Sequence, residues 1–340
     1  MTFELNNLHP KEDLSACNPR VCIIGGGVAG MACALWLKQL GFSAEIIERN
    51  ATLGGQLNNI DRINRWVLGF QGLTSQEIAR VYSNHTNIEN ISVRFNTEPA
   101  AVETMESGYR LYLQNADGNQ TVSEIQSLVI ATGVRALGSE VFNKTPGFGP
   151  LFAAGLIGCF PTDHLSRMEF LRGKTLAVIG GGDNAHFTVN DVALVAARTY
   201  LLMRSQPKAQ KKIRNEVRIL IDQERVMEYP EVEIIDFRQT WEGIELSLSK
   251  SGSVTAKIKV DMVFVRIGFT PNSEFLQNLD NLANMKKHSN GYIEIDSWRR
   301  TSIASVYAIG DVANPRLQSV VTAIADGAIA ARAIAQSIDK

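Results

Sequence analysis

Short apolar runs that lead directly into glycine-rich turns mark two places in the chain. The run Val21–Ile24 is followed by Gly25-Gly26-Gly27, and the run Leu176–Ile179 is followed by Gly180-Gly181-Gly182. Apolar runs of this length bounded by glycine predict buried β-strands. Each strand with its turn and the helix that follows predicts the start of a βαβ unit.

The rest of the pattern predicts the remaining elements. The turn Ala116–Asn119 indicates a hairpin, and the Gly- and Pro-rich stretch from about Ala136 to Pro150 indicates a loop at a change of domain. Further strands are expected around Ile91–Phe95, Tyr109–Leu113, Ser127–Ile130 and Met262–Val265, and a final helix over about Val320–Ile338.

Both glycine turns follow the spacing G-x-G-x-x-G/A. The glycines allow a tight turn, a close approach of the backbone to a pyrophosphate, and close packing of helix on strand. The helix N-terminus adds unpaired N–H groups and a positive dipole end for the phosphates. Two such motifs in one chain predict two bound dinucleotides, with electron transfer between them.

The residue that ends the second strand of each unit separates the two sites. Glu48 follows Ala44–Ile47, where an acid hydrogen-bonds a ribose 2′-OH, so the first site is predicted to bind FAD or NAD. Arg204 occupies the corresponding place after the second turn and favours the 2′-phosphate of NADP. The alternative is that Arg204 is a solvated surface residue.

Composition agrees with a soluble α/β enzyme of two domains. The chain has 340 residues, 45% of them hydrophobic and 20% charged, with a net charge of −1. This charge gives no general attraction to nucleic acid or to an anionic membrane. Residues 1–20 lack the pattern of a secretory signal, and no apolar run reaches the roughly 18 residues of a membrane span. We therefore expect a cytoplasmic protein.

The four cysteines are Cys17, Cys22, Cys33 and Cys159, and no two of them form C-x-x-C. Cys22 and Cys33 fall in the first strand and helix, where a buried, apolar role is expected. Cys159 lies in a loop-like stretch and is the candidate for redox activity. No metal-ligand spacing is present.

Taken in order, the motifs resemble those of the thioredoxin-reductase-like flavoproteins, the low-molecular-weight branch of the FAD-dependent pyridine nucleotide oxidoreductases. The resemblance covers nearly the whole chain after about Asn18. It rests on the Gly25–Gly30 turn, Glu48, Gly54-Gly55-Gln56, Ala131-Thr132-Gly133, the Gly180–Ala185 turn, Ile267–Asn272 and Gly310-Asp311.

The resemblance implies an α/β fold with two Rossmann-like, three-layer dinucleotide-binding domains. An N-terminal arm (1–19) would precede a split FAD domain (20–136 and 267–340), with the NAD(P) domain (137–266) inserted into it. A homodimer is also implied.

The same resemblance implies roles for individual residues. Glu48 would hold the adenosine ribose, Gln56 would lie close to the flavin, and Asp311 would bind the ribityl chain or a phosphate. Gln318 and Ser319 would begin a helix directed at the flavin N1/O2 edge, where a helix N-terminus stabilises the reduced flavin anion; an ordinary capped helix is the alternative. The implied FAD contacts are Gly25, Gly27, Gly30, Glu48, Gly55, Gln56, Ala131, Thr132, Gly133, Gly310, Asp311, Gln318 and Ser319. The implied NADP contacts are Gly180, Gly182, Asp183, Asn184, Ala185, Arg204 and Lys208.

Two departures from the family pattern bear on function. Thioredoxin reductases carry C-x-x-C before the second glycine turn, whereas a gapless count back from Gly180 reaches Asp163-His164-Leu165-Ser166. Phe187 and Thr188 replace two acidic residues, and of the family's arginine cluster only Arg204 is matched. Lys208, Lys211 and Lys212 are either substitute phosphate partners or a solvated helix face.

Three functions follow from these observations. Because a disulfide substrate needs an attacking and a resolving thiol, we first expect an FAD-dependent reductase that passes electrons from NAD(P)H to a protein carrier such as ferredoxin or flavodoxin. The second hypothesis is a thiol–disulfide oxidoreductase of the thioredoxin-reductase type, with Cys159 as catalytic residue and a thioredoxin-like partner, possibly fed by another carrier instead of NADPH. The third is a flavin-binding module without NAD(P)H turnover.

Overall fold

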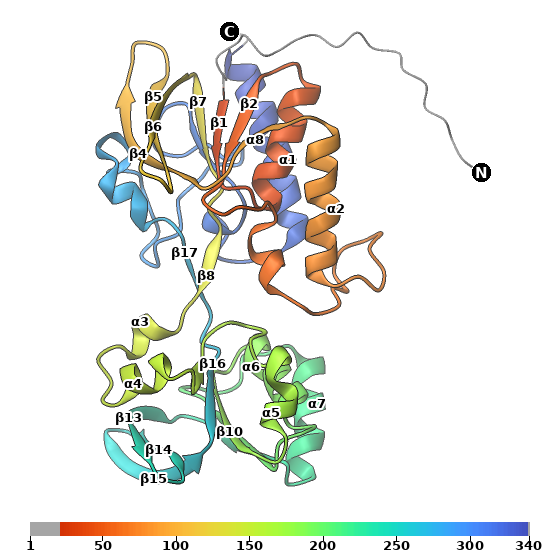
Figure 1. Cartoon of the computed structure of the whole chain (residues 1–340), viewed down its shortest axis with the longest axis vertical. Helices are drawn as coiled ribbons and strands as arrows, with labels where there is room; N and C mark the ends of the chain where they lie inside the picture. The colour runs from red at the N-terminus through yellow and green to blue at the C-terminus, as the bar shows by residue number, and fades with distance from the viewer. Residues whose placement is uncertain (1–20, 339–340) are drawn as a thin grey trace, which may run out of the picture. The chain divides into compact units, whose positions relative to one another are not determined.

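The computed structural model describes residues 21–338, which form two compact units (Figure 1). Unit 1 contains residues 21–55, 80–133 and 273–338, and unit 2 contains Gln56–Ala79 and Val134–Asn272. The predicted arm over residues 1–19, with Cys17, lies outside the described residues. The predicted boundaries of the FAD and NAD(P) domains stay a prediction.

Unit 1 is built on a parallel sheet of five strands in the order β18-β7-β1-β2-β3. In the central pair Val21 lies opposite Ser127 and Ile24 opposite Ile130, so both strands end at the same edge. The bounds are β1 (Val21–Ile24), β2 (Ala44–Ile47), β3 (Ser92–Arg94), β7 (Ser127–Ile130) and β18 (Val306–Ala308).

Both faces of this sheet are covered. Ile23 and Val129 pack with helices on one face, while Cys22 and Ile130 pack on the other face with a three-stranded antiparallel sheet. Helices α1, α2 and α8 lie side by side on their face of the sheet (Figure 1). These elements are α1 (Val28–Gln39), α2 (Ser75–Ile88), α8 (Val320–Ile338), β4 (Thr97–Thr104), β5 (Tyr109–Asn115) and β6 (Gln120–Ile125). The remaining turns of unit 1 are η4 (Glu274–Asn278), η5 (Asp280–Leu282) and η6 (Gly310–Val312).

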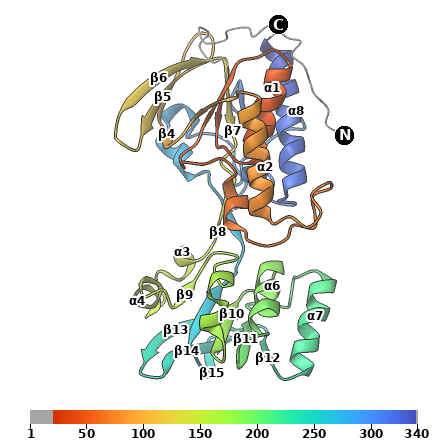
Figure 2. The same ribbon diagram turned by 45° about the vertical axis from the view of Figure 1, so that its right-hand side comes forward.

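Unit 2 repeats this arrangement with a parallel sheet in the order β12-β11-β10-β16-β9. Helices α6 and α7 cover one face, and the antiparallel sheet β13–β15 covers the other (Figure 2). The sheet strands are β9 (Ile157–Gly158), β10 (Thr175–Ile179), β11 (Arg198–Leu202), β12 (Val226–Tyr229) and β16 (Met262–Val265). The covering elements are α5 (Met168–Leu171), α6 (Asp183–Val192), α7 (Lys211–Asp222), β13 (Glu233–Thr240), β14 (Gly243–Lys250) and β15 (Ser253–Val260).

Shorter elements complete unit 2. A two-stranded sheet pairs β8 with β17 in antiparallel register. These shorter elements are β8 (Val134–Ala136), β17 (Phe269–Pro271), α3 (Ser139–Phe142), α4 (Phe148–Ala153), η2 (Gly55–Asn59, continuing from unit 1) and η3 (Leu165–Arg167).

The predicted α/β class with two Rossmann-like units is confirmed, because each unit has a parallel sheet covered on both faces. The expected hairpin between β5 and β6 and the final helix over Val320–Ile338 are also present. The loop expected from Ala136 to Pro150 is a correction: it contains α3 and the start of α4. Phe148 there is buried against Phe237, and this packing outweighs the local abundance of turn-forming residues.

Candidate functional site

The first glycine turn joins β1 to α1, and backbone carbonyl groups pack closely against two of its glycines. Gly25 has a φ of +113°, and a Cβ there would lie 2.4 Å from the Ala131 carbonyl oxygen. A Cβ on Gly30 would lie 2.0 Å from the Gly25 carbonyl oxygen. By contrast, no atom would lie within 4 Å of a Cβ on Gly27, at the start of α1. The turn is therefore filled on the side of the sheet and open where a pyrophosphate would meet the helix N-terminus.

Glu48 is tied to this turn. Its buried carboxylate accepts hydrogen bonds at Oε2 from the Gly26 backbone N–H (2.7 Å) and at Oε1 from the Asn50 backbone N–H (2.8 Å). The Asn50 side-chain amide also donates to Oε1 (2.7 Å). A carboxylate has about four acceptor sites, so capacity remains for a ribose hydroxyl. The predicted acid thus lies beside the predicted glycines.

Gly310 and Asp311 begin the short helix η6 beside the start of α1. A Cβ on Gly310 would lie 2.8 Å from the Ala29 Cβ, which brings this segment to the first glycine turn. The Gly310 N–H donates to Asp326 Oδ2 (3.1 Å), and Arg299 Nε donates to Asp326 Oδ1 (2.7 Å). The sequence did not indicate this contact between Arg299 and Asp326, because neither residue belongs to a motif.

Asp311 has a buried oxygen, Oδ1, that accepts no hydrogen bond from any residue the structure describes. Burial is the main cause that raises the pKa of Asp311 to about 6; the Asp326 carboxylate adds to the rise, and the Ser319 backbone N–H opposes it. An orphaned carboxylate oxygen needs a hydrogen-bond donor. A ribityl hydroxyl supplies one, whereas a phosphate anion does not, so the geometry favours the first of the two predicted roles.

Gln318 and Ser319 lie directly before α8, as expected. Gln318 Nε2 donates to the Tyr292 hydroxyl (2.6 Å), and Ser319 Oγ accepts from the Thr322 N–H (3.2 Å), an N-cap contact. The role of this helix start toward flavin stays a prediction.

The other predicted FAD contacts divide between the two units. Gly55 has a φ of +56°, and a Cβ there would lie 3.1 Å from the Gly27 Cα. Ala131 follows β7 and its N–H donates to the Ile24 carbonyl (2.8 Å), so the stretch Ala131-Thr132-Gly133 begins at the first turn. Gln56 belongs to unit 2, where its side-chain amide donates to the Val134 carbonyl.

The second glycine turn has the same construction. Gly180 has a φ of +142°, and a Cβ there would lie 2.1 Å from the Arg266 carbonyl oxygen, while the space at Gly182 is open. The loop after β11 is held against the turn by the Lys208 N–H, which donates to the Gly181 carbonyl (2.7 Å). Arg204, in the same loop, has an exposed side chain, as has Lys208.

Asp183 and Asn184 open α6 at this turn. Both oxygens of Asp183 accept from Gln210, one from its backbone N–H and one from its side-chain amide, each at 2.8 Å. Ala185 is buried below the turn. The predicted NADP contacts in unit 2 therefore converge on one helix N-terminus and the adjoining loop.

Cys159 follows the edge strand β9 and is half-buried. Its thiol packs on Gly138, where a Cβ would lie 2.7 Å from Sγ. Burial raises the pKa of Cys159 to about 11; the Asp163 carboxylate adds to the rise, and the Arg266 guanidinium opposes it. Cys159 lines a small cavity together with Asn184 of the second turn. The candidate thiol thus lies beside the nucleotide turn.

Arg266 is a buried residue beside the candidate site that the sequence did not indicate. Its guanidinium is buried and donates to the Thr188 hydroxyl (3.1 Å), the Gly158 carbonyl (3.2 Å) and the Asp163 carboxylate. It therefore joins α6, β9 and the Cys159 loop. The available signal was a charged residue directly after the apolar run Met262–Val265.

The stretch aligned with the missing dithiol has structural roles. Asp163 pairs with Arg266, and the buried His164 contacts Asp191 Oδ2 through Nε2 (2.8 Å). Asp191 also pairs with Arg62, whose guanidinium lies 4.8 Å from the centre of the Phe187 ring.

Two negative findings apply to residues 21–338. Within that range no group of three or more His, Cys, Asp or Glu side chains is placed to hold a metal ion. None of the helices there is both long and apolar enough to pass through a membrane.

The residues of unit 1 fit FAD. The open space at Gly27, the carboxylate of Glu48 and the orphaned Asp311 oxygen offer what a pyrophosphate, a ribose and a ribityl chain require.

Comparison with known proteins agrees with this geometry. A family model described as pyridine nucleotide-disulphide oxidoreductase matches residues 19–327. The chain is 27% identical over 332 residues to thioredoxin reductase from Bacillus subtilis, covering 94% of this chain and 95% of the relative. It is 29% identical over 338 residues to thioredoxin reductase from Treponema pallidum, covering 94% and 97%. The crystal structure of T. acidophilum thioredoxin reductase shares the fold, with a TM-score of 0.77 at 21% identity over 94% of this chain and 99% of that one.

Proposed function

The chain belongs to the pyridine nucleotide-disulphide oxidoreductase family, and we propose that it is a thioredoxin-reductase-type flavoenzyme that reduces a disulfide of a thioredoxin-like protein. The family makes it an oxidoreductase, and thioredoxin reductases use FAD and NADPH. The observation that carries the proposal is Cys159, which shares a small cavity with Asn184 at the second nucleotide turn.

Each dinucleotide has a binding frame in the chain. Glu48 would bind the FAD adenosine ribose, the first glycine turn its pyrophosphate and Asp311 a ribityl hydroxyl. The second glycine turn would bind NADPH, with Arg204 and Lys208 on its 2′-phosphate. When bound, FAD supplies the hydride and electron chemistry that connects nicotinamide to the acceptor.

Cys159 is the cysteine of unit 2 and the proposed nucleophile. It attacks one sulfur of the acceptor disulfide as a thiolate, forming a mixed disulfide and releasing the other sulfur as a thiolate. Because this chain has no C-x-x-C, the two electrons that NADPH would supply by way of bound FAD would reduce the mixed disulfide, restoring the Cys159 thiolate and releasing the second acceptor sulfur as a thiol. By resemblance, the enzyme is proposed to act as a homodimer.

A second candidate is transfer to a one-electron protein carrier such as ferredoxin or flavodoxin. Two observations favour it: the missing second thiol and the raised pKa of Cys159. In that case no cysteine of this chain takes part.

The test mixes FAD-loaded protein anaerobically with NADPH and then supplies oxidised thioredoxin, ferredoxin or flavodoxin. We expect rapid flavin bleaching and reduction of thioredoxin by the wild type. Cys159→Ser should keep the bleaching and lose thioredoxin reduction, while Cys17→Ser keeps both. Full activity of Cys159→Ser toward ferredoxin or flavodoxin, with no thioredoxin reduction by either form, would establish the second candidate instead.

A further inference from the structure

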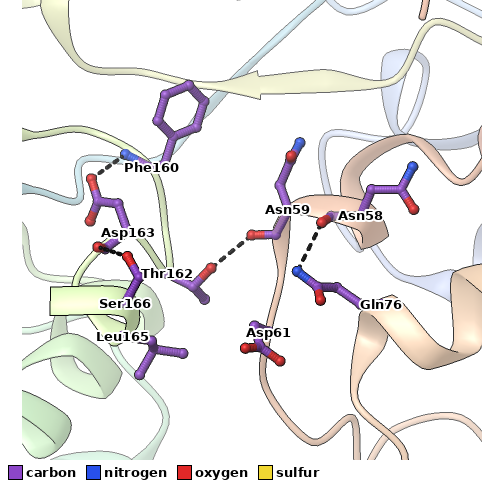
Figure 3. Close-up of a pocket in the computed structure, with 9 residues that line it drawn as sticks. All are labelled: Asn58, Asn59, Asp61, Gln76, Phe160, Thr162, Asp163, Leu165 and Ser166. Atoms are coloured by element: carbon purple, nitrogen blue, oxygen red, sulfur yellow. Dashed lines mark hydrogen bonds between the residues drawn. The ribbon is translucent and has the colours of Figure 1, made fainter. Parts of the chain in front are cut away.

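Unit 2 contains a cavity of about 460 Å³ that is lined mostly by polar residues (Figure 3). Its walls come from two segments that are far apart in sequence, one running from Asn58 to Gln76 and one from Phe160 to Ser166. The Thr162 hydroxyl donates to the Asn59 carbonyl (2.7 Å) and joins the two walls.

Some hydrogen-bond donors of these walls are used within the walls, while the side-chain amides of Asn58 and Asn59 also line the cavity. Besides Thr162, Gln76 Nε2 donates to the Asn58 carbonyl (3.1 Å), and the Ser166 hydroxyl donates to the Asp163 carbonyl (3.3 Å). A hydroxyl whose hydrogen is donated keeps its lone pairs. Because the carboxylates of Asp61 and Asp163 only accept, and each amide or hydroxyl oxygen has two lone pairs, the lining has more acceptor sites than donors.

The charges of the lining also favour a positively charged ligand. Two carboxylates, Asp61 and Asp163, line the cavity, and no Lys, Arg or His does so. Asp163 is neutralised by the buried Arg266. Asp61 is exposed and forms no ion pair within residues 21–338. One carboxylate among acceptor groups is complementary to a cation with several N–H donors, such as an ammonium group.

The cavity adjoins the proposed redox turn. Within the tetrapeptide Cys159–Thr162, Phe160 and Thr162 line this cavity, whereas Cys159 and Pro161 line the small cavity at Asn184. A group bound here would lie against the turn that carries the thiol.

We propose that this cavity binds an ammonium group of the acceptor, so that the enzyme prefers disulfides with a positive charge close to the sulfur–sulfur bond. This inference rests on the proposed function. The reaction is NADPH + H⁺ + RSSR → NADP⁺ + 2 RSH: the S–S bond breaks, the nicotinamide is oxidised, and the two thiol hydrogens come from the hydride equivalent and from one solvent proton.

The kinetic test uses three small disulfides of similar size: cystamine, which is dicationic, 2-hydroxyethyl disulfide, which is neutral, and dithiodiglycolate, which is dianionic. A charge-assisted contact should give cystamine a KM about tenfold below that of the neutral disulfide, with dithiodiglycolate highest. Asp61→Asn should raise the cystamine KM to the neutral value and leave kcat unchanged. Asp117→Asn, the same change at an exposed carboxylate in the hairpin turn of unit 1, should leave the order intact.

A further experiment distinguishes two sources of the ammonium group, a lysine side chain of a protein acceptor and a small amine. Lysine acetylation of oxidised thioredoxin should raise its KM with the wild type, but not with Asp61→Asn, if the group is a protein side chain. If acetylation has no effect while cystamine is still preferred, the group belongs to a small amine. Equal KM values for all three disulfides, or a preference unchanged by Asp61→Asn, would overturn the inference.

Direct binding separates this inference from the proposed function. By calorimetry at low ionic strength, 1,6-diaminohexane should bind the full chain at least about tenfold more tightly than 1,6-hexanediol, and Asp61→Asn should equalise them. If no disulfide is reduced but the diamine still binds through Asp61, the proposed function fails and the cationic site stands. If the diamine binds no better than the diol, the cationic site fails whatever the enzyme reduces.

Discussion

The buried guanidinium of Arg266 forms an ion pair with the partly exposed carboxylate of Asp163, which connects the end of β16 to the loop carrying Cys159. Asp163 Oδ2 also accepts from the Phe160 N–H (3.1 Å), so the same carboxylate closes the Cys159 loop on itself. Burial of Arg266 lowers its pKa, and the charge of Asp163 opposes this shift.

Removing one member of this pair should be strongly destabilising. Asp163→Asn leaves the buried Arg266 cation without its counter-charge, which costs about 3–5 kcal/mol of unfolding free energy. Urea unfolding followed by circular dichroism measures it. The double variant Asp163→Asn/Arg266→Met should lose clearly less than the sum of the single changes, and Glu169→Gln in the exposed pair with Arg172 should change almost nothing. Additive effects would show that the two side chains act independently.

Glu48→Gln should weaken FAD binding by about tenfold to a hundredfold. The amide keeps one acceptor oxygen but places an N–H₂ group where the carboxylate accepts from Gly26 or Asn50. The flavin absorbance that survives gel filtration, and flavin fluorescence during titration of the apoprotein, report the loss. Glu103→Gln, an exposed change on β4, is the matched control and should retain full flavin. A Glu48→Gln protein as yellow as the wild type would remove Glu48 from the site.

FAD affinity should rise with pH through about 6. The folded apoprotein holds a proton on Asp311 more tightly than an unfolded chain does, because burial and the neighbouring Asp326 raise the pKa of Asp311 to about 6. Between pH 4 and 6 the folded state therefore binds more protons, and the stability of the apoprotein falls as pH rises. A ribityl hydroxyl that donates to Asp311 favours the ionised form, so binding strengthens over the same interval.

Asp311→Asn provides the control for this pH effect. It should flatten the pH dependence of the apoprotein stability and of the FAD dissociation constant between about pH 4 and 6, and it should weaken FAD binding at pH 7.5. Thermal unfolding and fluorescence titration at several pH values measure the two quantities. An unchanged pH profile in the variant would assign the titration to another group.

Arg204→Ala should remove a preference for NADPH over NADH and leave the NADH rate nearly unchanged. A charge-assisted contact to phosphate corresponds to a preference of about tenfold to a hundredfold, and the exposure of Arg204 favours the lower end. Rates of anaerobic flavin reduction with each nucleotide measure it. Arg218→Ala, on α7 and paired with Asp222, is the control. Equal use of both nucleotides by the wild type would contradict the assignment of Arg204.

The fold could be predicted from the sequence because the patterns that indicate its strands and turns are local. The apolar runs at β1 and β10 and the glycines after them lie within a few residues of each other, and Gly25 and Gly180 need positive φ at places where a Cβ would meet a carbonyl oxygen. Glu48 was found in the same way, through its fixed distance from the first turn.

The ion pairs that hold the site in place could not be predicted from the sequence, because they join residues that no local pattern connects. Arg266 and Asp163 are 103 positions apart, and Arg299 and Asp326 lie in different elements. A gapless count placed Asp163 at the position of a missing cysteine, and only the structure shows its carboxylate closing the loop of Cys159. The short helices α3 and α4 were not predicted for a related reason, since Phe142 and Phe148 pack against Phe237 of the distant strand β13.

Removing the charge of Asp163 and removing the charge of Arg266 should change the reactivity of Cys159 in opposite directions. With the pKa of Cys159 at about 11, about one thiol in a thousand is ionised at pH 8, so alkylation by iodoacetamide should be slow and should rise with pH without levelling below about pH 10. Removing the Asp163 charge lowers this pKa, and removing the Arg266 charge raises it. Asp163→Asn should therefore accelerate alkylation at pH 8, and Arg266→Met should slow it. Mass spectrometry of the Cys159 peptide isolates this site from Cys22 and Cys33, whose burial also raises their pKa. Acceleration by both variants would mean that the pair acts only by holding the loop closed, because loss of structure exposes the thiol whichever charge is removed.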